Sequence, residues 1–277
     1  MKFTKNLCGS KLEILIPLEW EFSDSVNKCF KFWELFENKY SRFIEWNHLS
    51  ELNKKWGWEI SSDLIGILKL CQEVSKKSDG YFDITVCSRL ENLWYWIKTE
   101  EIQENIWYKN IIIDNNSLYL KNWINIDIWA IWKWYLVDVF YNILDKNIDN
   151  FTINFGWDIR VKWTKNISLE DPINLWKSLW TVELSNSSIA SSSWNRRIFW
   201  ESHHLINPKT KESQNDKIWV YVQHKLASFA DIFSTALFVT PLDKSLEILA
   251  STPGLEALII SKNGEIYKSK WFQYTIK

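Results

Sequence analysis

The chain has 277 residues with 33 basic and 34 acidic side chains, which give a formal net charge of -1 at pH 7. This balance argues against a nucleic-acid partner, because such proteins usually carry an excess of basic residues. No uninterrupted apolar run reaches about 18 residues, so no membrane-spanning helix is predicted. The four cysteines are widely separated and form no CxxC pair, which favours a reducing compartment.

The composition is unusual in having 20 tryptophans and only 7 glycines. About 19 glycines would be ordinary at this length, because turns and close backbone approaches need a residue without a Cβ. One interpretation is a Trp-rich surface, such as a sugar-binding module. The other is that UGA codons meaning glycine have been translated as tryptophan. Trp123, Trp157 and Trp163 lie at turn-like places between predicted strands, which favours the second interpretation.

The first part of the chain is predicted to contain two amphipathic helices. Apolar residues recur at helical spacing over residues 24–40, directly after the cap signal Ser23–Asp24. A second helix is predicted to begin near Ser61 and to end at Gly80, with lysines in its last turn. The segment before both helices contains a predicted strand at 12–18 but lacks the apolar stretch of a secretory signal.

Short β-rich segments dominate the rest of the chain. A hairpin is predicted around Asn115–Asn116, and a helix with apolar residues from Leu136 to Leu144 follows it. Later elements are predicted as strands at 151–155, 158–163, 179–184 and 218–223, helices at 230–239 and 243–251, and a C-terminal hairpin over 258–269. Because there is no low-complexity linker or internal repeat, we expect one compact α+β unit that could have two lobes.

The segment Asp127–Asp138 is the most informative candidate for chemistry. A strand is predicted to end at Asp127 and a helix to start near Trp134, with Lys133 in the connection. If its three tryptophans are read as glycine, the segment is a glycine-rich loop whose N–H groups and helix dipole could bind phosphate. Read literally, the indoles would obstruct a phosphate, and the segment would be an ordinary strand-to-helix turn.

Two smaller groups of polar residues are further candidates. Asp231 and Thr235 would share one face of a helix, and a carboxylate beside a hydroxyl suits Mg²⁺, which prefers oxygen ligands. A helix cap by Asp231 explains the same spacing equally well. His203 and His204 are adjacent, which is more typical of a loop than of a metal site, and no zinc-binding spacing is present. The serine-rich run at 185–193, which precedes two arginines, could hold a phosphate or be a polar loop.

Seven segments carry short motifs whose order and spacing are informative together. They are Ser41–Asn53, Asp79–Val86, Asp127–Asp138, Asn154–Ile159, Ala190–Arg196, His204–Lys211 and Ala230–Leu237. In this order they resemble the ApbE family of FAD:protein FMN transferases, over nearly the whole chain. Four tryptophans stand where that family has glycine, namely Trp129, Trp134, Trp157 and Trp194, and this supports the recoding interpretation. Recoding does not explain Asn207 for the family's Asp or Lys211 for its Gly.

The resemblance implies a Mg²⁺-dependent transfer of FMN from FAD to a threonine hydroxyl of an acceptor flavoprotein, with release of AMP. It implies one domain over residues 1–277 with a T-fold-like α+β fold, in which two lobes with mixed or antiparallel sheets and flanking helices hold FAD between them. By the same resemblance, the FAD site would be lined by Cys8, Phe43, Tyr81, Phe82, Asp83, Asp127, Lys133 and Ile206. The metal would be bound by Asp231, Thr235 and the backbone carbonyl of Ala130, with Ser234 adjacent.

His204 is the candidate general base for the incoming hydroxyl, since an unperturbed imidazole titrates near neutrality. Two other functions stay open at this point. The same site could act as a Mg²⁺-dependent FAD pyrophosphatase that gives FMN and AMP, or the chain could be a non-catalytic flavin- or ligand-binding module. The absence of a signal predicts a cytoplasmic protein as the sequence reads, although many members of the family are exported or membrane-anchored.

Overall fold

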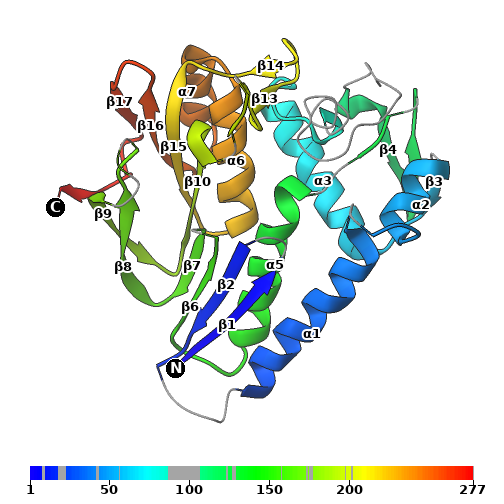
Figure 1. Ribbon diagram of the computed structural model, residues 1–277, viewed down its shortest axis with the longest axis horizontal. Helices are drawn as coiled ribbons and strands as arrows, with labels where there is room; N and C mark the ends of the chain where they lie inside the picture. Colours follow the sequence, from blue (N-terminus) through cyan, green and yellow to red (C-terminus); the bar gives the residue numbers. More distant parts are fainter. Residues whose placement is uncertain are drawn as a thin grey trace.

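An eight-stranded antiparallel sheet forms the centre of the computed structural model (Figure 1). The structure describes residues 1–276 apart from 8–9, 18–22, 42–43, 56, 87–106, 123, 127–128, 157, 173, 175–176, 197 and 201. In spatial order the strands of this sheet are β1 (Lys2–Leu7), β2 (Ser10–Leu15), β6 (Phe151–Phe155), β7 (Ile159–Lys162), β10 (Ser188–Ser193), β15 (Lys217–His224), β16 (Glu256–Ser261) and β17 (Ile266–Lys268).

Helices cover one face of the large sheet in two layers (Figure 1). The inner layer contains α5 (Trp129–Leu144), α6 (Ala227–Val239) and α7 (Leu242–Ser251). Beyond it lie α1 (Ser23–Tyr40), α2 (His48–Lys55) and α3 (Ser62–Lys77). A three-stranded sheet of β3 (Gly57–Glu59), β5 (Ser117–Leu120) and β4 (Ile111–Asp114) lies next to α2.

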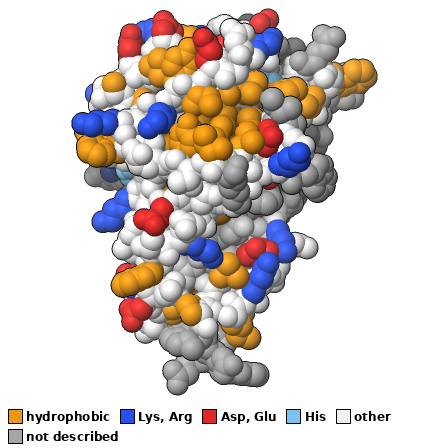
Figure 2. Space-filling model, turned by 90° about the vertical axis from the view of Figure 1, so that its left-hand side faces the viewer, with side chains coloured by type: hydrophobic (Ala, Val, Ile, Leu, Met, Phe, Trp, Pro, Cys, Tyr) orange, Lys and Arg blue, Asp and Glu red, His pale blue; other side chains and the backbone are white. Residues whose placement is uncertain are grey.

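A second three-stranded sheet lies on the side of the large sheet away from α1 and α3. It consists of β18 (Thr275–Ile276), β9 (Ser178–Ser185) and β8 (Thr164–Glu170). Figure 2 views the molecule from this side and shows hydrophobic side chains gathered in the upper part of the face. Among the elements on this side, β9 carries the exposed Leu179 and β17 the exposed Ile266.

Two apolar clusters stabilise these layers. The larger one lies between the large sheet and the helices and includes Val26 of α1, Phe140 of α5 and Phe233 of α6, all fully buried. The smaller one joins the large sheet to β8 and β9, with Val182 and Trp219 among its members. Burial of this apolar surface is the main favourable term in folding, and it fixes α5 and α6 against the strands that they cover.

The predicted α+β class is confirmed, and most predicted elements are present. The helices expected at 24–40 and from Ser61 to Gly80 are α1 and α3, and the hairpin around Asn115–Asn116 is β4–β5. Four predicted strands correspond to β6, β7, β9 and β15, and the two late helices to α6 and α7. Among the described residues, no helix is long and apolar enough to span a membrane.

Two sequence-based expectations around the candidate phosphate loop were wrong. Helix α5 begins at Trp129 and not near Trp134, and residues 124–126 are irregular where the end of a strand was expected. The reason lies in the residues: tryptophan tolerates a helix far better than glycine does, so the apolar run 129–132 extends the helix toward its N-terminus. Strands β8 and β10 and helix α2 were not predicted.

Three of the tryptophans that the structure describes have a left-handed backbone conformation. The φ angles are +66° at Trp46, +79° at Trp163 and +55° at Trp200. All three side chains are exposed, so no packing interaction in the core compensates for this geometry. A bulky residue rarely adopts φ > 0, whereas glycine does so freely. The backbone therefore supports the view that glycine belongs at these positions.

Candidate functional site

The candidate site lies where α5 and α6 meet strands β2, β7 and β10. Lys133 of α5 donates a hydrogen bond of 2.8 Å to the Ser10 hydroxyl of β2. Asp158, which precedes β7, lies close enough to Lys133 and to Asp231 of α6 for their charges to influence its titration. Segments that are more than 100 residues apart in sequence therefore converge here, and each supplies a charged or polar side chain.

Two carboxylates, Asp158 and Asp231, are buried near each other in this site, and each residue is 7% exposed. Burial raises the pKa of Asp158 well above its usual range, and the charge of Asp231 raises it further. The backbone N–H of Ser191, at 3.2 Å, and the nearby charges of Lys133 and Arg196 act in the opposite direction. A site that crowds two carboxylates in this way would gain from a bound cation, because the cation relieves their repulsion.

A network of hydroxyl groups completes the oxygen-rich part of the site. The Ser192 hydroxyl lies 2.8 Å from that of Ser234 and 3.3 Å from that of Thr235. The Ser234 hydroxyl also donates to the backbone carbonyl of Asp231 at 2.9 Å. Ser234 therefore ties α6 to β10, while Asp231 and Thr235 lie four residues apart on the same helix, as their spacing predicted.

The structure overturns the interpretation of Asp231 as a helix cap. Helix α6 begins at Ala227, so Asp231 lies inside the helix and not at its N-terminus. Across the described ranges, no three residues of the types His, Cys, Asp and Glu form a cluster that could hold a metal. The donor set instead combines one or two carboxylates with hydroxyls, which fits Mg²⁺, an ion usually bound by few carboxylates together with substrate phosphates.

The remaining metal candidate, Ala130, lies in the first turn of α5. Carbonyl groups at the start of a helix accept intrahelical hydrogen bonds, so this carbonyl is not oriented as a loop carbonyl would be. Its role as a ligand stays a prediction.

Three residues of the predicted FAD site lie close together after α3. Asp83 is buried and accepts hydrogen bonds from the Thr85 N–H at 2.9 Å, the Thr85 hydroxyl at 2.7 Å and the Tyr108 N–H at 2.7 Å. Burial raises the pKa of Asp83, and these hydrogen bonds partly offset that effect. Phe82 is buried and Tyr81 is half-buried. Asp83 thus fixes the loop that presents the two aromatic residues.

This loop lies against the hairpin formed by β13 (Ile206–Asn207) and β14 (Glu212–Ser213). The Lys209 ammonium lies 4.0 Å from the centre of the Tyr81 ring and 2.9 Å from the Asp79 carboxylate. Lys209 lowers the pKa of Asp79. Ile206, the fourth described FAD candidate of this region, is buried on β13. The structure therefore brings together two segments that are more than 100 residues apart in the chain.

The two departures from the family pattern differ in how they fit this hairpin. The Asn207 amide donates to the Gln214 side-chain oxygen at 2.9 Å, while its own oxygen accepts from the Lys209 N–H at 2.9 Å. An ionised carboxylate can only accept hydrogen bonds, whereas Asn207 both donates and accepts in this hairpin. Lys211 has a φ of +62°, a left-handed conformation that glycine adopts freely but that is strained for a residue with a Cβ, so this departure is not explained by the backbone.

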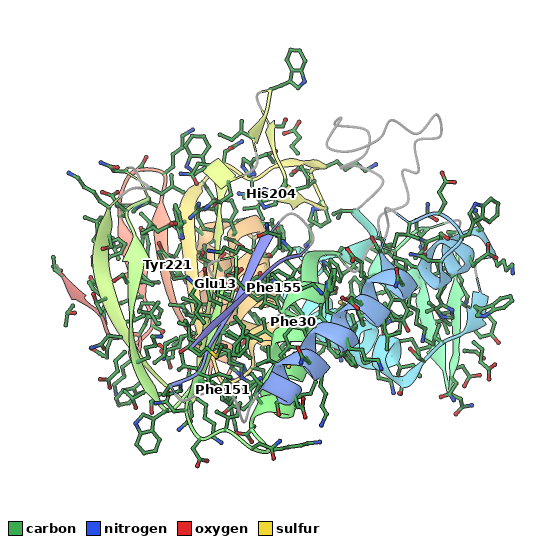
Figure 3. The ribbon with its side chains drawn as sticks, turned by 60° about the horizontal axis from the view of Figure 1, so that its bottom comes forward. Glu13, Phe30, Phe151, Phe155, His204 and Tyr221 are labelled. Atoms are coloured by element: carbon green, nitrogen blue, oxygen red, sulfur yellow. The ribbon has the colours of Figure 1, made fainter. Side chains whose placement is uncertain are left out.

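The adjacent histidines differ in their surroundings. His203 is 3% exposed, its Nδ1 accepts from the Leu205 N–H at 3.2 Å, and its Nε2 lies 3.0 Å from the Gln214 carbonyl. These partners require the neutral ring with its proton on Nε2, and burial lowers the pKa of His203. His204 is only half-buried and lies between β12 (Ser202–His203) and β13 (Figure 3). Of the two, His204 is the one that a substrate could contact.

Three predicted site residues, Cys8, Phe43 and Asp127, lie outside the described residues. Conversely, Ser10, Asp158 and Ser192 belong to the site but were not among the predicted residues. Asp158 and Ser192 lie in segments that resemble family motifs, so for these two residues the signal was present in the sequence. What the sequence did not show was which members of those motifs point into the same space.

Comparisons with known proteins identify what the chain is similar to. A model of the ApbE family matches residues 9–259. An ApbE protein from Thermotoga maritima matches with a TM-score of 0.86 at 21% sequence identity. The match covers 98% of this chain and 97% of the Thermotoga maritima chain. The flavin transferase ApbE from Vibrio cholerae matches with a TM-score of 0.83 at 20% sequence identity, over 98% of this chain and 97% of the Vibrio cholerae chain.

The flavinyl transferase ApbE from Pseudomonas stutzeri gives a TM-score of 0.81 at 18% identity, with coverages of 98% and 95%. At these identities the likeness of the structures concerns the fold. A search of the curated proteins found no match.

Proposed function

The chain belongs to the ApbE family, and from this premise we propose that it transfers FMN from FAD to a threonine hydroxyl of an acceptor flavoprotein, with Mg²⁺, releasing AMP. One observation carries the proposal. The buried Asp231 carboxylate lies on one helix with Thr235, with Asp158 and the Lys133 ammonium in its neighbourhood. Such a site can bind a cation and a pyrophosphate together. Two structural neighbours, from Vibrio cholerae and Pseudomonas stutzeri, are flavin or flavinyl transferases, and this supports the same reaction class.

The reaction needs positioning more than covalent chemistry from the protein. The threonine Oγ forms a bond to the phosphorus on the FMN side of the pyrophosphate, and the bond from that phosphorus to the AMP oxygen breaks. AMP leaves with the electron pair of that bond, and the threonine proton passes to a base. Orientation of the two reactants and neutralisation of the developing charge supply most of the catalysis in phosphoryl transfer.

Each side chain then has a part in this reaction. Asp231 and Thr235 would hold Mg²⁺, which when bound neutralises charge on the pyrophosphate. Lys133 would bind a phosphate oxygen through its ammonium group. Tyr81 and Phe82 would contact the flavin from the loop that Asp83 fixes, with Ile206 from the neighbouring hairpin.

His204 would receive the proton of the threonine hydroxyl. It is half-buried, and its neighbour His203 is committed to hydrogen bonds inside the protein. A general base must reach the proton that it removes, and His204 meets this requirement better than any fully buried histidine.

One experiment separates the proposed transfer from its two alternatives. The purified chain is incubated with FAD, Mg²⁺ and a threonine-bearing acceptor protein, and the products are analysed by mass spectrometry and chromatography. Covalent FMN on the acceptor, with AMP in equal amount, is the expected result. Free FMN with AMP would instead identify a pyrophosphatase, and unchanged FAD would identify a binding module. Omission of Mg²⁺ tests the cation requirement in the same assay.

A further inference from the structure

Helix α6, which carries Asp231 and Thr235, has no capping side chain of its own. Its N-cap residue is Leu226, which makes no side-chain cap hydrogen bond. The first N–H groups of a helix have no intrahelical partner and must be satisfied by another group. In this chain the Ala227 and Ser228 N–H groups donate to the Asp138 carboxylate of α5 at 2.9 Å and 3.0 Å. The Ser228 hydroxyl adds a third hydrogen bond at 2.6 Å.

Asp138 is itself held in place by Arg160 of β7. The two form an ion pair in which the side chains are 13% and 5% exposed, respectively. The Arg160 guanidinium also lies 3.7 Å from the centre of the Tyr141 ring, one turn after Asp138 on α5. A carboxylate with these four donors is fixed from three elements: α5, the start of α6, and β7 in the centre of the large sheet.

This connection is close to the candidate site on both helices. Asp138 follows Lys133 by five residues on α5, and Ser228 precedes Asp231 by three residues on α6. Because a helix moves as a rigid unit, the position of its first turn sets where the next turn points its side chains. The Asp138 carboxylate therefore controls how Asp231 and Thr235 are placed relative to Lys133 and Asp158.

We propose that Asp138 is a positioning residue for the cation site: it caps α6 from α5 and so sets the geometry with which Asp231 and Thr235 bind a divalent ion. This inference rests on the proposed function, which assigns those two residues to the cation. Asp138 does not contact the ion or the reacting atoms, and it acts only through α6. Groups that orient metal ligands in this way typically change metal affinity by about 10–100-fold when they are removed.

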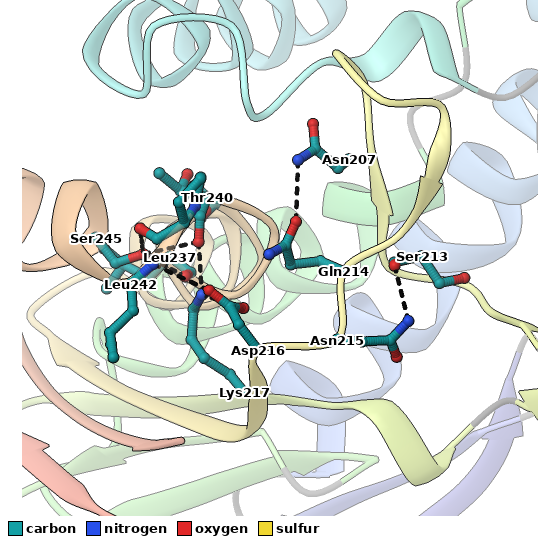
Figure 4. Close-up of polar contacts among 12 residues, drawn as sticks. Asn207, Ser213, Gln214, Asn215, Asp216, Lys217, Leu237, Thr240, Leu242 and Ser245 are labelled. Carbon is teal, nitrogen blue, oxygen red and sulfur yellow. Dashed lines mark hydrogen bonds and ion pairs between the residues drawn. The ribbon is translucent and has the colours of Figure 1, made fainter. Parts of the chain in front are cut away.

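A purely structural role predicts a loss of stability alone, and Asp216 provides a matched control for it. The Asp216 carboxylate accepts from the Leu242 N–H, the first residue of α7, at 3.0 Å and pairs with the Lys217 ammonium at 2.7 Å (Figure 4). This arrangement repeats that of Asp138. In both cases an aspartate that is paired with a basic side chain caps a helix to which it does not itself belong. Helix α7, however, carries none of the candidate site residues.

The test measures binding of Mn²⁺, used as a probe for the divalent site, by electron paramagnetic resonance on the full chain with FAD present. For Asp138→Ala we expect a dissociation constant for Mn²⁺ about 10–100-fold above that of the unchanged protein. For Asp216→Ala we expect a change of less than about twofold, although both substitutions remove a cap. Asp138→Asn keeps the side-chain volume and one acceptor oxygen, so it should weaken Mn²⁺ binding to an intermediate degree. This variant replaces Asp138→Ala in the test if Asp138→Ala does not fold.

Hydrogen exchange gives a second readout that is independent of the ion. Asp138→Ala should speed amide exchange in the first two turns of α6, and Asp216→Ala should do so in α7. Unchanged Mn²⁺ affinity in both Asp138 variants, or an equal loss in Asp216→Ala, would overturn the inference while leaving flavin transfer intact. If the unchanged protein binds Mn²⁺ with the expected dependence on Asp138 but transfers no FMN, the proposed function fails and the positioning role stands. If the unchanged protein binds no Mn²⁺ at all, the proposed function and the positioning role of Asp138 both fail.

Discussion

The Lys133 ammonium on α5 donates a 2.8 Å hydrogen bond to the Ser10 hydroxyl on β2, across 123 residues of sequence. The Lys133 side chain is buried, and its charge lies near the Asp158 carboxylate and lowers the pKa of that group. A buried lysine loses much of its hydration, so it binds an incoming anion strongly. The pair therefore holds a positive charge where the pyrophosphate of FAD is proposed to bind.

Replacing Lys133 by Met should weaken FAD binding by about 10–100-fold, because a hydrogen bond to a charged group is worth about 1.5–3 kcal/mol. Met keeps most of the side-chain volume, so the fold should be retained. The dissociation constant for FAD can be measured by quenching of flavin fluorescence. Ser10→Ala removes only a partner of the ammonium and should have a smaller effect. An unchanged FAD affinity in Lys133→Met would show that Lys133 serves packing alone.

Replacing Asp231 by Ala should abolish Mg²⁺-dependent turnover and leave the protein folded. Ala offers no oxygen to a hard cation, and the substitution also removes a negative charge near Asp158. Relief of that repulsion should make the variant no less stable than the parent. Turnover is measured over a Mg²⁺ titration, and the unfolding midpoint is measured in parallel. Activity within a few-fold of the parent at saturating Mg²⁺ would make the Asp231–Thr235 pair structural.

Reading the coding DNA tests the origin of the tryptophans. We expect UGA codons at Trp129, Trp134, Trp157 and Trp194, where the family has glycine. The backbone adds Trp46, Trp163 and Trp200, which have a positive φ. We expect UGG at Trp33, which is buried on α1, and at Trp176, which lies outside the glycine motifs. UGG at the four motif positions would contradict recoding and favour an inactive homologue.

The same idea can be checked on the protein through Trp163→Gly. Left-handed backbone costs a residue with a Cβ about 1–2 kcal/mol, and the exposed Trp163 side chain gains little packing in return. The free energy of unfolding should therefore rise by about 1 kcal/mol, as measured by urea titration. Glycine in place of Trp180, which is buried on β9 without a positive φ, should instead destabilise the protein.

The sequence predicted the helices best where one face is apolar and the other polar. Helix α1 follows this pattern from Ser23 to Tyr40, and its periodicity is visible without knowledge of the fold. Strand β10 was missed because its sequence, SIASSS, has little β-branched or aromatic content. Its neighbours β7 and β15 in the large sheet make it a strand, and this information is not local.

The candidate site shows the same division between local and distant information. The spacing of Asp231 and Thr235 identified them because both lie on one helix. Ser10, Asp158 and Ser192 reach the site from or beside different strands, so only the paired sheet brings them to α5 and α6. The sequence analysis placed the start of α5 too late. It read three tryptophans of this segment as glycine, which favours a loop, whereas tryptophan at these positions allows a helix that begins at Trp129.

Acid should destabilise the protein partly through His203. Burial lowers its pKa in the folded state, so below about pH 6.5 the unfolded chain binds a proton that the folded chain does not. The contribution of His203 is therefore present above that pH and is lost as the pH falls through the folded pKa. The free energy of unfolding is compared at about pH 7.5 and 5.5 for the parent and for His203→Gln. We expect a smaller loss in the variant, with the remainder coming from His48 and His224, whose pKa values burial also lowers. If the parent and His203→Gln lose the same free energy of unfolding between the two pH values, the acid sensitivity comes from groups other than His203.

Replacing His204 by Ala should slow covalent flavin transfer by about 10²–10⁴-fold, which is the range for loss of a general base. FAD affinity should change little, because the imidazole would act on the acceptor hydroxyl and not on the isoalloxazine. Single-turnover rates at saturating FAD, measured on protein with glycine restored at the family positions, separate the chemical step from binding.

His203 provides the control for this assignment. Its ring is hydrogen-bonded to the Leu205 N–H and the Gln214 carbonyl inside the protein, so it cannot take a proton from a substrate without losing one of these bonds. His203→Ala should therefore lower stability and leave the single-turnover rate of the folded fraction nearly unchanged. If His204 only packs beside the flavin, its variant will bind FAD more weakly and react at an almost normal rate at saturation. If the His203 variant is slower than the His204 variant, the assignment of His204 as the general base is wrong.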